Sequence, residues 1–371
     1  MATVFIKKAA PKTVVDDYQN LLRQFRKQLP SGEAIIIKLN LSWTKFYPAC
    51  SSPPWQLEGI IKGLLSLGFS PKQIIPVENK TVVTNVKRGA VNHAWNKVCQ
   101  KYGVQIHFLD DEPYRLYQPK GKMLILDKIF PAGISLPKIV FNKPLISLCT
   151  LKTHVFTQNT GAIKNYFGML DTNRHHAHRF IHQAIIDLLT IQKEIHPQTV
   201  AFMDGTTIGY GSGPRAMKLK KADLILASTD QVALDSTAAK IIGLNNSKIN
   251  YLCLGEKLNL GENRSKNIRF RFFGQINQLP NFRLKGADNA ASCGQKFIYH
   301  HCPWWLEKLL LQTIVAPWSY LASRLYYDFY WYQTIGRKRL KAFLASDWGK
   351  LFQEYQQESL GKTQKSIGQS T

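Results

Sequence analysis

The sequence predicts an α/β fold, in which a mostly parallel β-sheet carries helices on both faces. Three observations lead to this prediction. Short β-branched segments alternate with longer segments of helical apolar spacing from the start of the chain. Several apolar runs are continuous, as in strands that are buried on both faces. Hydrophobic residues make up 44% of the 371 residues, which is enough for one large buried core.

The expected elements follow one another in a strand–helix rhythm that is typical of parallel sheets. Proline or glycine ends several of the expected helices, at Pro30, Gly68, Gly103 and Gly243. In chain order we expect a strand at 4–6, a helix at 14–29, a strand at 34–41, a helix at 57–67, strands at 74–78 and 104–109 separated by a helix at 90–102, strands at 138–142 and 144–149, a helix at 175–195, strands at 199–204 and 223–228, a helix at 232–242 and a strand at 268–273.

The expected domains are an α/β core at 1–290, a helical aromatic and basic extension at 291–355, and a disordered Gln/Ser/Lys/Gly-rich tail at 356–371. A core of two α/β lobes, divided near 130–145, is an alternative. The six cysteines include no CxxC run, so neither a zinc ribbon nor an intrinsic iron–sulfur cluster is expected. The start of the chain has no signal-peptide pattern, and no apolar run reaches the roughly 20 residues of a membrane span, so a cytoplasmic location is expected.

One segment concentrates polar residues directly after an expected buried strand. Lys152, His154, Lys164 and Asn165 lie close together in the sequence after 144–149, with glycines between them. Open α/β sheets place their sites at the carboxyl ends of strands. Lysines near glycines and free backbone amides can hold an anion. An ordinary basic loop is the alternative.

Histidines are spaced along the expected helix at 175–195. His175, His178 and His182 fall at i, i+3 and i+7, which places them on one face of an α-helix. This spacing suits a divalent metal. Contact with an anionic substrate and a solvated histidine-rich turn are the alternatives.

Two acidic residues follow expected strands and complete the candidate site. Asp204 ends the strand at 199–204, and a glycine-rich stretch that includes Gly211 and Gly213 comes next. Asp230 follows the strand at 223–228, although it also suits a helix N-cap. Carboxylates opposite lysine and histidine are usual in general acid–base chemistry. The prediction is that Lys152, Lys164, His178, Asp204 and Asp230 converge on one cleft.

These segments, in this order, resemble the bacterial and archaeal proteins that share domain of unknown function 362. The matching pieces span residues 34–272 and are Ile37-Lys-Leu-Asn40, Leu151-Lys-Thr-His154, Ala162-Ile-Lys-Asn-Tyr-Phe-Gly168, Asp204-Gly205, Gly211-Ser-Gly-Pro214 and Ala227-Ser-Thr-Asp-Gln-Val-Ala-Leu-Asp235. The resemblance adds Lys38 and Asn40 to the residues expected to bind substrate, although the family usually has Lys-Pro-Asn there. Many members carry a ferredoxin-like module, which this chain lacks. The architecture is also distantly similar to nickel-dependent lactate racemases, at the level of the fold.

The leading functional hypothesis is an enzyme that acts on a small anionic substrate. The formal net charge of +25 favours anionic partners. Lys152, Lys164, Asn165, Gly211 and Gly213 would bind the substrate, and His154, Lys164, Asp204 and Asp230 would act in catalysis. A non-catalytic metal- or cofactor-binding protein is one alternative. A factor that lies on an anionic membrane surface, or self-associates, through 299–355 is another. Nucleic acid is not favoured, because no nucleic-acid motif is present.

Overall fold

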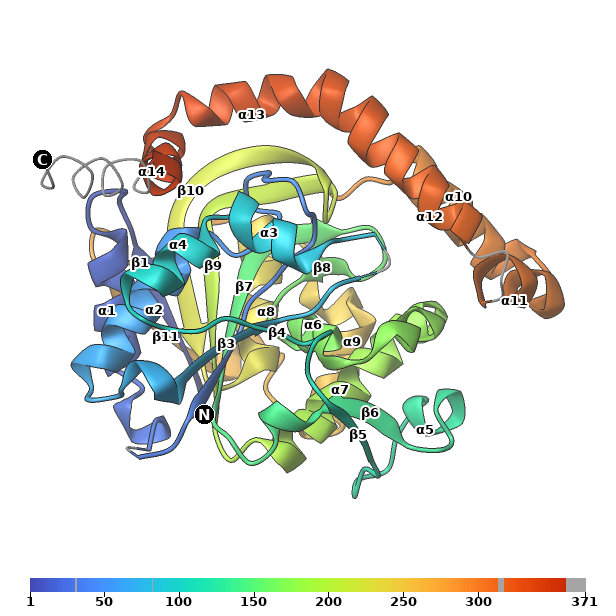
Figure 1. Ribbon diagram of the computed structural model, residues 1–371, viewed down its shortest axis with the longest axis horizontal. Helices are drawn as coiled ribbons and strands as arrows, with labels where there is room; N and C mark the ends of the chain where they lie inside the picture. Colours follow the sequence, from blue (N-terminus) through green and yellow to red (C-terminus); the bar gives the residue numbers. More distant parts are fainter. Residues whose placement is uncertain (31, 82, 313–316, 358–371) are drawn as a thin grey trace, which may run out of the picture.

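The computed structural model describes residues 1–30, 32–81, 83–312 and 317–357, and its centre is a β-sheet (Figure 1). In this described part of the chain the sheet has nine strands, eight of them in the order β11-β1-β10-β9-β7-β2-β3-β4, with β8 paired to β7. The strands are β1 (Ala2–Lys8), β2 (Ile35–Lys38), β3 (Ile74–Glu78), β4 (His107–Phe108), β7 (Leu145–His154), β8 (Gln158–Thr160), β9 (Thr199–Ser212), β10 (Ala216–Ser228) and β11 (Ile268–Phe273). β5 (Tyr114–Tyr117) and β6 (Ile134–Pro137) form a separate hairpin.

The sheet is mixed but mostly parallel, as the sequence predicted. β4, β3, β2, β7 and β9 run parallel to one another, and β1 runs parallel to β11. β10 is antiparallel to both of its neighbours, β1 and β9. Strands from both sides of residues 130–145 join this one sheet, so that stretch does not separate two sheets.

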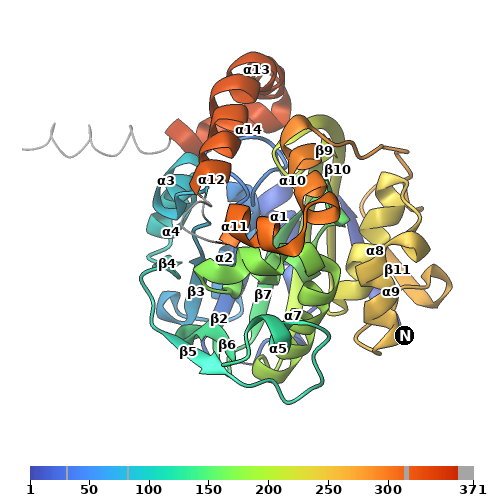
Figure 2. The same cartoon turned by 90° about the vertical axis from the view of Figure 1, so that its right-hand side faces the viewer.

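Helices cover both faces of the sheet (Figures 1 and 2). The first face packs against α1 (Val14–Arg23), α2 (Pro54–Ser66), α3 (Val86–Asn92) and α4 (Trp95–Lys101). The second packs against α6 (Ala162–Asn165), α7 (Ile181–Ile195), α8 (Gln231–Ile242) and α9 (Asn250–Lys257). Successive side chains of strand β2 point to opposite faces of the sheet, so β2 contributes to the cores on both faces. Ile35 and Ile37 pack in the core of the first face, and Ile36 packs in the core of the second.

Short helices connect these elements. They are α5 (Leu126–Ile129) and the 3-10 helices η1 (Arg26–Gln28), η2 (Pro71–Gln73), η3 (Lys138–Val140), η4 (Tyr166–Met169), η5 (Thr172–Phe180), η6 (Asn246–Lys248) and η7 (Ser265–Asn267).

Several elements differ from those that the sequence predicted. The expected strand at 138–142 is the 3-10 helix η3 at its start. The expected helix at 90–102 is interrupted by Ala94, which has a left-handed φ of 58° and separates α3 from α4. The expected helix at 175–195 is 3-10 helix η5 up to Phe180, and α7 begins at Ile181. Apolar spacing did not reveal these local changes in backbone conformation.

The glycine-rich stretch after Asp204 is strand, not a connector. β9 continues through it to Ser212 and pairs with β10 over most of its length. Glycine in a strand leaves no side chain to pack and permits close approach of other chain segments. The expected strands at 199–204 and 223–228 are therefore the two ends of one long hairpin.

A helical arm formed by residues 290–312 and 317–344 arches over one edge of the core (Figure 1). Its elements are α10 (Ala290–His301), α11 (Trp304–Gln312), α12 (Pro317–Arg324), the π-helix η8 (Leu325–Gly336) and α13 (Arg337–Leu344). α14 (Asp347–Gln357) follows and packs against the first core through Trp348 and Phe352. Residues 358–371, most of the expected disordered tail, lie outside the described residues; Gln356 and Gln357 belong to α14.

Polar and aromatic contacts fasten the arm to the core. The indole Nε1 of Trp43 donates to Oδ1 of Asp328 at 2.6 Å, and the rings of Trp43 and Trp331 lie 6.0 Å apart. At the far end, Nε1 of Trp348 donates to Oδ1 of Asp223 at 2.7 Å. Much of the aromatic content of 299–355 thus packs on the protein's own core.

The continuous helical stretch α12–η8 carries two apolar stripes. Tyr327 and Trp331 face the core and are buried. A second stripe of four residues at spacings of three and four faces solvent, with 44–68% of each side chain exposed: Trp318, Leu321, Leu325 and Phe329. Within the described ranges, none of the helices combines the length and the hydrophobicity that a membrane crossing requires.

Candidate functional site

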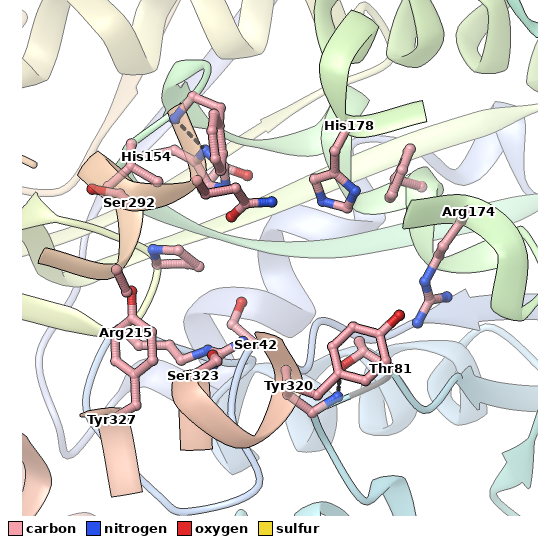
Figure 3. Close-up of a pocket in the computed structure, with 18 of the residues that line it drawn as sticks. Ser42, Thr81, His154, Arg174, His178, Arg215, Ser292, Tyr320, Ser323 and Tyr327 are labelled. Atoms are coloured by element: carbon pink, nitrogen blue, oxygen red, sulfur yellow. Dashed lines mark hydrogen bonds between the residues drawn. The ribbon is translucent and has the colours of Figure 1, made fainter. Parts of the chain in front are cut away.

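A cavity of about 690 Å³ lies where the arm passes over the carboxyl ends of the parallel strands (Figure 3). Lys38 ends β2, Glu78 ends β3 and His154 ends β7, and all three side chains line the cavity. This is the edge at which open α/β sheets bind ligands. The other lining residues include Asn40, Lys80, Phe156, Lys164, Asn165, Phe167, Arg174, His178, Pro214, Arg215, Ile298, Trp318, Tyr320, Ala322, Ser323, Tyr326 and Tyr327.

The cavity is basic. Among the described residues that line it, five are lysine or arginine and one is a carboxylate, Glu78. Lys38 and Lys80 have acidic partners: Nζ of Lys38 lies 2.7 Å from Oε1 of Glu78, and Nζ of Lys80 lies 3.6 Å from Asp110. Arg174 donates to the backbone carbonyls of Gly168, Leu170 and Lys80. These three cations are held by the protein itself.

Lys164 and Arg215 are different. Over the described chain, neither side chain has a hydrogen-bond acceptor or an acidic partner. Nζ of Lys164 lies 5.8 Å from the centroid of the Phe167 ring, and the Arg215 guanidinium lies 4.8 Å from that of Tyr327. Such ring contacts leave the donor groups of both cations available to a ligand.

Short helix α6 sets the position of Lys164, and Asp235 sets the position of α6. Burial and the positive charges of Lys152 and Arg174 lower the pKa of Lys164 to about 8. The Asp235 carboxylate accepts the first backbone N–H of α6, from Ala162. Gly161 permits this contact, because a Cβ at that position would lie 2.0 Å from Oδ1 of Asp235.

His154 faces the cavity as a neutral hydrogen-bond donor. Its Nδ1 accepts the backbone N–H of Phe156 at 3.1 Å and that of Thr157 at 3.4 Å. A neutral imidazole with Nδ1 as acceptor carries its proton on Nε2. Burial, followed by the charge of Lys164, lowers the pKa of His154 well below its usual value. His154 can therefore donate a hydrogen bond from Nε2, and its role in catalysis stays a prediction.

Lys152 lies behind the cavity and not in it. Its buried Nζ donates to Oδ1 of Asn40 at 2.8 Å, to Oγ of Ser42 at 3.1 Å and to the carbonyl of Cys50. Asn40 lines the cavity and donates in turn to Oδ1 of Asn165 at 3.3 Å. Burial lowers the pKa of Lys152 to about 8. Lys152 thus supports Asn40 and Asn165, which lie at the cavity wall.

The two carboxylate oxygens of Glu78 differ in their hydrogen bonding. Oε1 accepts from Lys38 and from the backbone N–H of Asn79, whereas Oε2 is buried and accepts no hydrogen bond from the described residues. A buried carboxylate oxygen without a donor is costly. A ligand hydroxyl or amine in the cavity would satisfy it.

Asp204 does not belong to the cavity, contrary to the predicted convergence. Its carboxylate is buried on the first face of the sheet. Oδ2 accepts from the hydroxyl of Tyr18 at 2.8 Å and from Nε1 of Trp55 at 2.9 Å, and Oδ1 accepts from Oγ1 of Thr206 at 2.7 Å. These donors use the carboxylate to join α1 and α2 to the sheet.

Asp230 lies at the opposite end of the sheet from Lys152. β10 runs antiparallel to β9: Ser228, at the end of β10, pairs with Ala201, whereas Lys152 pairs with Gly209. Eight residues of strand separate these positions, roughly 25 Å at about 3.3 Å per residue. The Asp230 carboxylate caps α8 by accepting the N–H of Ala233 at 2.9 Å. The predicted convergence of Asp230 with the lysines is therefore wrong, because the strand before it runs the other way.

The histidine stripe is not one α-helical face. His178 belongs to 3-10 helix η5 and His182 to α7, and the side chain of His175 lies outside the described residues. His178 lines the cavity with its ring 5.2 Å from that of Phe167, and His182 stacks on Tyr251. Among the described side chains, no three of His, Cys, Asp and Glu are grouped as metal ligands.

Gly211 and Gly213 hold the β9–β10 turn against β7. The carbonyl of Gly211 accepts from Oγ1 of Thr153 at 2.9 Å, and the carbonyl of Gly213 accepts the N–H of Val155 at 3.1 Å. Neither lines the cavity, but Pro214 and Arg215 directly after them do. Sequence reasoning missed Arg215 and Glu78. The end of the strand at 74–78 was a usable signal for Glu78.

The polar residues of this site lie in a part of the chain that matches a known protein family. A search of curated proteins finds no match. The family model of a domain of unknown function, DUF362, matches residues 35–240. This range contains Lys38, Glu78, His154, Lys164 and Arg215, whereas the arm lies beyond it. Because the match covers more than half of the chain, the protein belongs to the DUF362 family.

Proposed function

We propose that the protein is an enzyme whose cavity binds the phosphate or carboxylate of its substrate through Lys164 and Arg215. The observation that carries this proposal is that both cations line the cavity without an acidic partner among the described residues. A desolvated cation without a counter-charge, such as Lys164, is unfavourable, and a bound anion removes that penalty.

The chemistry that these groups support is proton transfer beside an anionic or carbonyl oxygen. Lys164, whose pKa burial lowers to about 8, holds the anion as an ammonium and can donate a proton to it. The Nε2–H of His154 can donate to an oxygen on which negative charge develops, since the imidazole stays neutral. Oε2 of Glu78 can accept a substrate hydroxyl.

Thermal unfolding with a panel of anions tests the proposal. Phosphate or a carboxylate should stabilise the wild-type protein, by about 2.7 kcal/mol at 100 times its dissociation constant. Lys164→Gln and Arg215→Gln should each reduce this gain. Lys218→Gln is the matched control, because Lys218 is exposed on β10 and does not line the cavity. An equal response of all four proteins would contradict the assignment of the two cations.

We also propose that the arm rests on an anionic membrane surface. The exposed stripe Trp318, Leu321, Leu325 and Phe329 is accompanied by exposed basic residues at Arg324, Arg337, Lys338 and Lys341. The one acidic residue of the described part of 317–344, Asp328, is used by Trp43. Apolar side chains flanked by positive charge favour anionic lipid headgroups.

Flotation with phosphatidylglycerol-containing vesicles tests this second proposal. The full chain should float with these vesicles at low salt and not with purely zwitterionic ones. Leu325→Glu and Phe329→Glu should reduce flotation. Leu116→Glu is the matched control, because Leu116 is 62% exposed on β5, away from the arm. Flotation that is unchanged in both arm variants would contradict the membrane role of the stripe.

A further inference from the structure

We infer that the ligand of the cavity is an anionic amphiphile, with its charged head at Lys164 and Arg215 and an apolar chain beneath the arm. This inference rests on the proposed function, because it names the substrate class of the same site.

The size of the cavity exceeds what an anionic group alone requires. Its volume of about 690 Å³ is in the range of cavities that enclose a complete organic ligand, about 300–1,000 Å³. A water molecule occupies about 30 Å³ of the liquid, and a phosphate is only a few times larger than that. Most of the space is therefore left for a part of the ligand that Lys164 and Arg215 do not contact.

The two sides of the cavity differ in chemistry. The carboxyl ends of the strands and the segments after them contribute the lysines, arginines and histidines. The arm contributes no charged side chain among its described lining residues: Ile298, Trp318, Ala322 and Tyr326 are apolar or aromatic, and Ser292, Gln295 and Ser323 are polar but uncharged. Figure 3 shows Tyr320, Ser323 and Tyr327 on the arm, across the pocket from His154 and His178. A ligand that fills this space meets cations from the core, of which Arg215 lies against Tyr327 of the arm, and uncharged, mostly apolar or aromatic side chains from the arm.

Trp318 connects the cavity with the outside of the arm. It lines the cavity, it is 44% exposed, and it begins the outer stripe that continues through Leu321. Trp318 is therefore the residue that the cavity wall and the exposed stripe share. A ligand with an apolar chain can contact Trp318 from inside the cavity, which a small hydrophilic anion does not need.

A series of alkyl phosphates of increasing length, each used below its micelle concentration, tests the inference by calorimetric binding to the full chain. Affinity should rise from methyl phosphate through butyl and octyl to dodecyl phosphate, by at least 100-fold over the series, since each buried CH₂ contributes about 0.8 kcal/mol. Lys164→Gln should weaken every member of the series. Dodecyltrimethylammonium, with the same chain and the opposite charge, should bind far more weakly.

Two arm variants give a matched comparison. Ile298→Asn places an amide in the wall of the cavity that the arm forms. It should weaken the binding of dodecyl phosphate at least tenfold and leave the binding of methyl phosphate unchanged. Leu321→Asn alters the outer stripe, not the cavity, and should leave both affinities unchanged in solution.

The outcomes separate this inference from the proposed function. If methyl and dodecyl phosphate bind equally, and both depend on Lys164, the amphiphile is wrong and the anion site stands. Binding of dodecyltrimethylammonium as tight as that of dodecyl phosphate overturns the charged-head assignment. If no alkyl phosphate and no inorganic phosphate bind, the anion site and the amphiphile both fail.

Discussion

Asp235 of α8 accepts the backbone N–H of Ala162 at 2.7 Å, and the next N–H, of Ile163, at 3.2 Å. A carboxylate from a neighbouring helix therefore caps α6, a role that a residue just before the helix usually has. Since Lys164 is the third residue of α6, the link between α8 and α6 determines where the Lys164 amine enters the cavity.

Gly161→Ala should disturb this link. The added methyl would lie 2.0 Å from Oδ1 of Asp235 and 2.9 Å from Cε of Met203, so α6 or α8 must move. We expect a loss of about 1–3 kcal/mol in the free energy of unfolding, typical of overpacking, together with weaker phosphate binding. Urea unfolding measures the first effect. Gly286→Ala is the control, because no atom lies within 4 Å of the position that its new methyl group would take; a loss of equal size there would refute the steric explanation.

Asp235→Asn should change how stability depends on pH. Burial raises the pKa of Asp235 to about 7 in the folded protein, against about 3.9 in an unfolded chain. Between these values the folded state holds a proton that the unfolded state has lost, so this group makes the free energy of unfolding fall as pH rises from about 4 to 7. Urea titrations of wild type and Asp235→Asn across this range should diverge in slope and run parallel above pH 7. Parallel curves throughout would contradict the raised pKa.

Lys164 should react with amine reagents at lower pH than an ordinary lysine. Its pKa of about 8 places the midpoint of labelling by trinitrobenzenesulfonate near pH 8, whereas unperturbed lysines titrate near 10.4. Mass spectrometry of peptides labelled at each pH would locate the reaction. Bound phosphate should protect Lys164 and shift its midpoint upward, because a nearby anion favours the ammonium form. A midpoint above pH 10 without ligand would show that the amine is well solvated.

Asp204→Asn should reduce stability without affecting the cavity. Three side chains donate to this carboxylate, and the amide nitrogen of asparagine would face donors in either orientation. We expect a loss on the order of 2 kcal/mol or more in urea unfolding, with the phosphate-induced thermal shift retained. Tyr18→Phe, which removes one of the donors, should cost less. A variant of normal stability that no longer binds phosphate would restore Asp204 as a site residue.

The sheet and its helices could be predicted because the buried strands are continuous apolar runs. Ile35, Ile36 and Ile37 are all buried, which happens when both faces of a strand are covered. The direction of β10 could not be predicted, because the apolar pattern of a strand is the same whether the strand lies parallel or antiparallel to its neighbours. That single ambiguity misplaced Asp230.

For the candidate site, the sequence identified the residues that follow β7 and missed those from other parts of the chain. Lys164 and His154 lie close in sequence, whereas Arg215 enters from the β9–β10 turn and Tyr327 from the arm. Aromatic content alone could not show which ring faces the core: Tyr327 is buried, and Phe329 two residues later is 68% exposed. Which ring is buried depends on the rotation of the arm helix about its own axis. The hydrogen bond between Trp43 and Asp328, which are 285 positions apart in the chain, fixes this rotation.

The position of the arm late in the chain also affects synthesis. The sheet uses residues 2–273, so all its strands leave the ribosome before the arm that closes the cavity. At about 5–20 residues per second, residues 290–357 take roughly 3 to 14 s to follow. During that interval Trp43 and Tyr47, which later pack against Trp331, have no partner from the arm. A nascent chain at this stage exposes an aromatic surface beside an open basic cavity, and such transiently exposed apolar surface favours aggregation until the arm covers it.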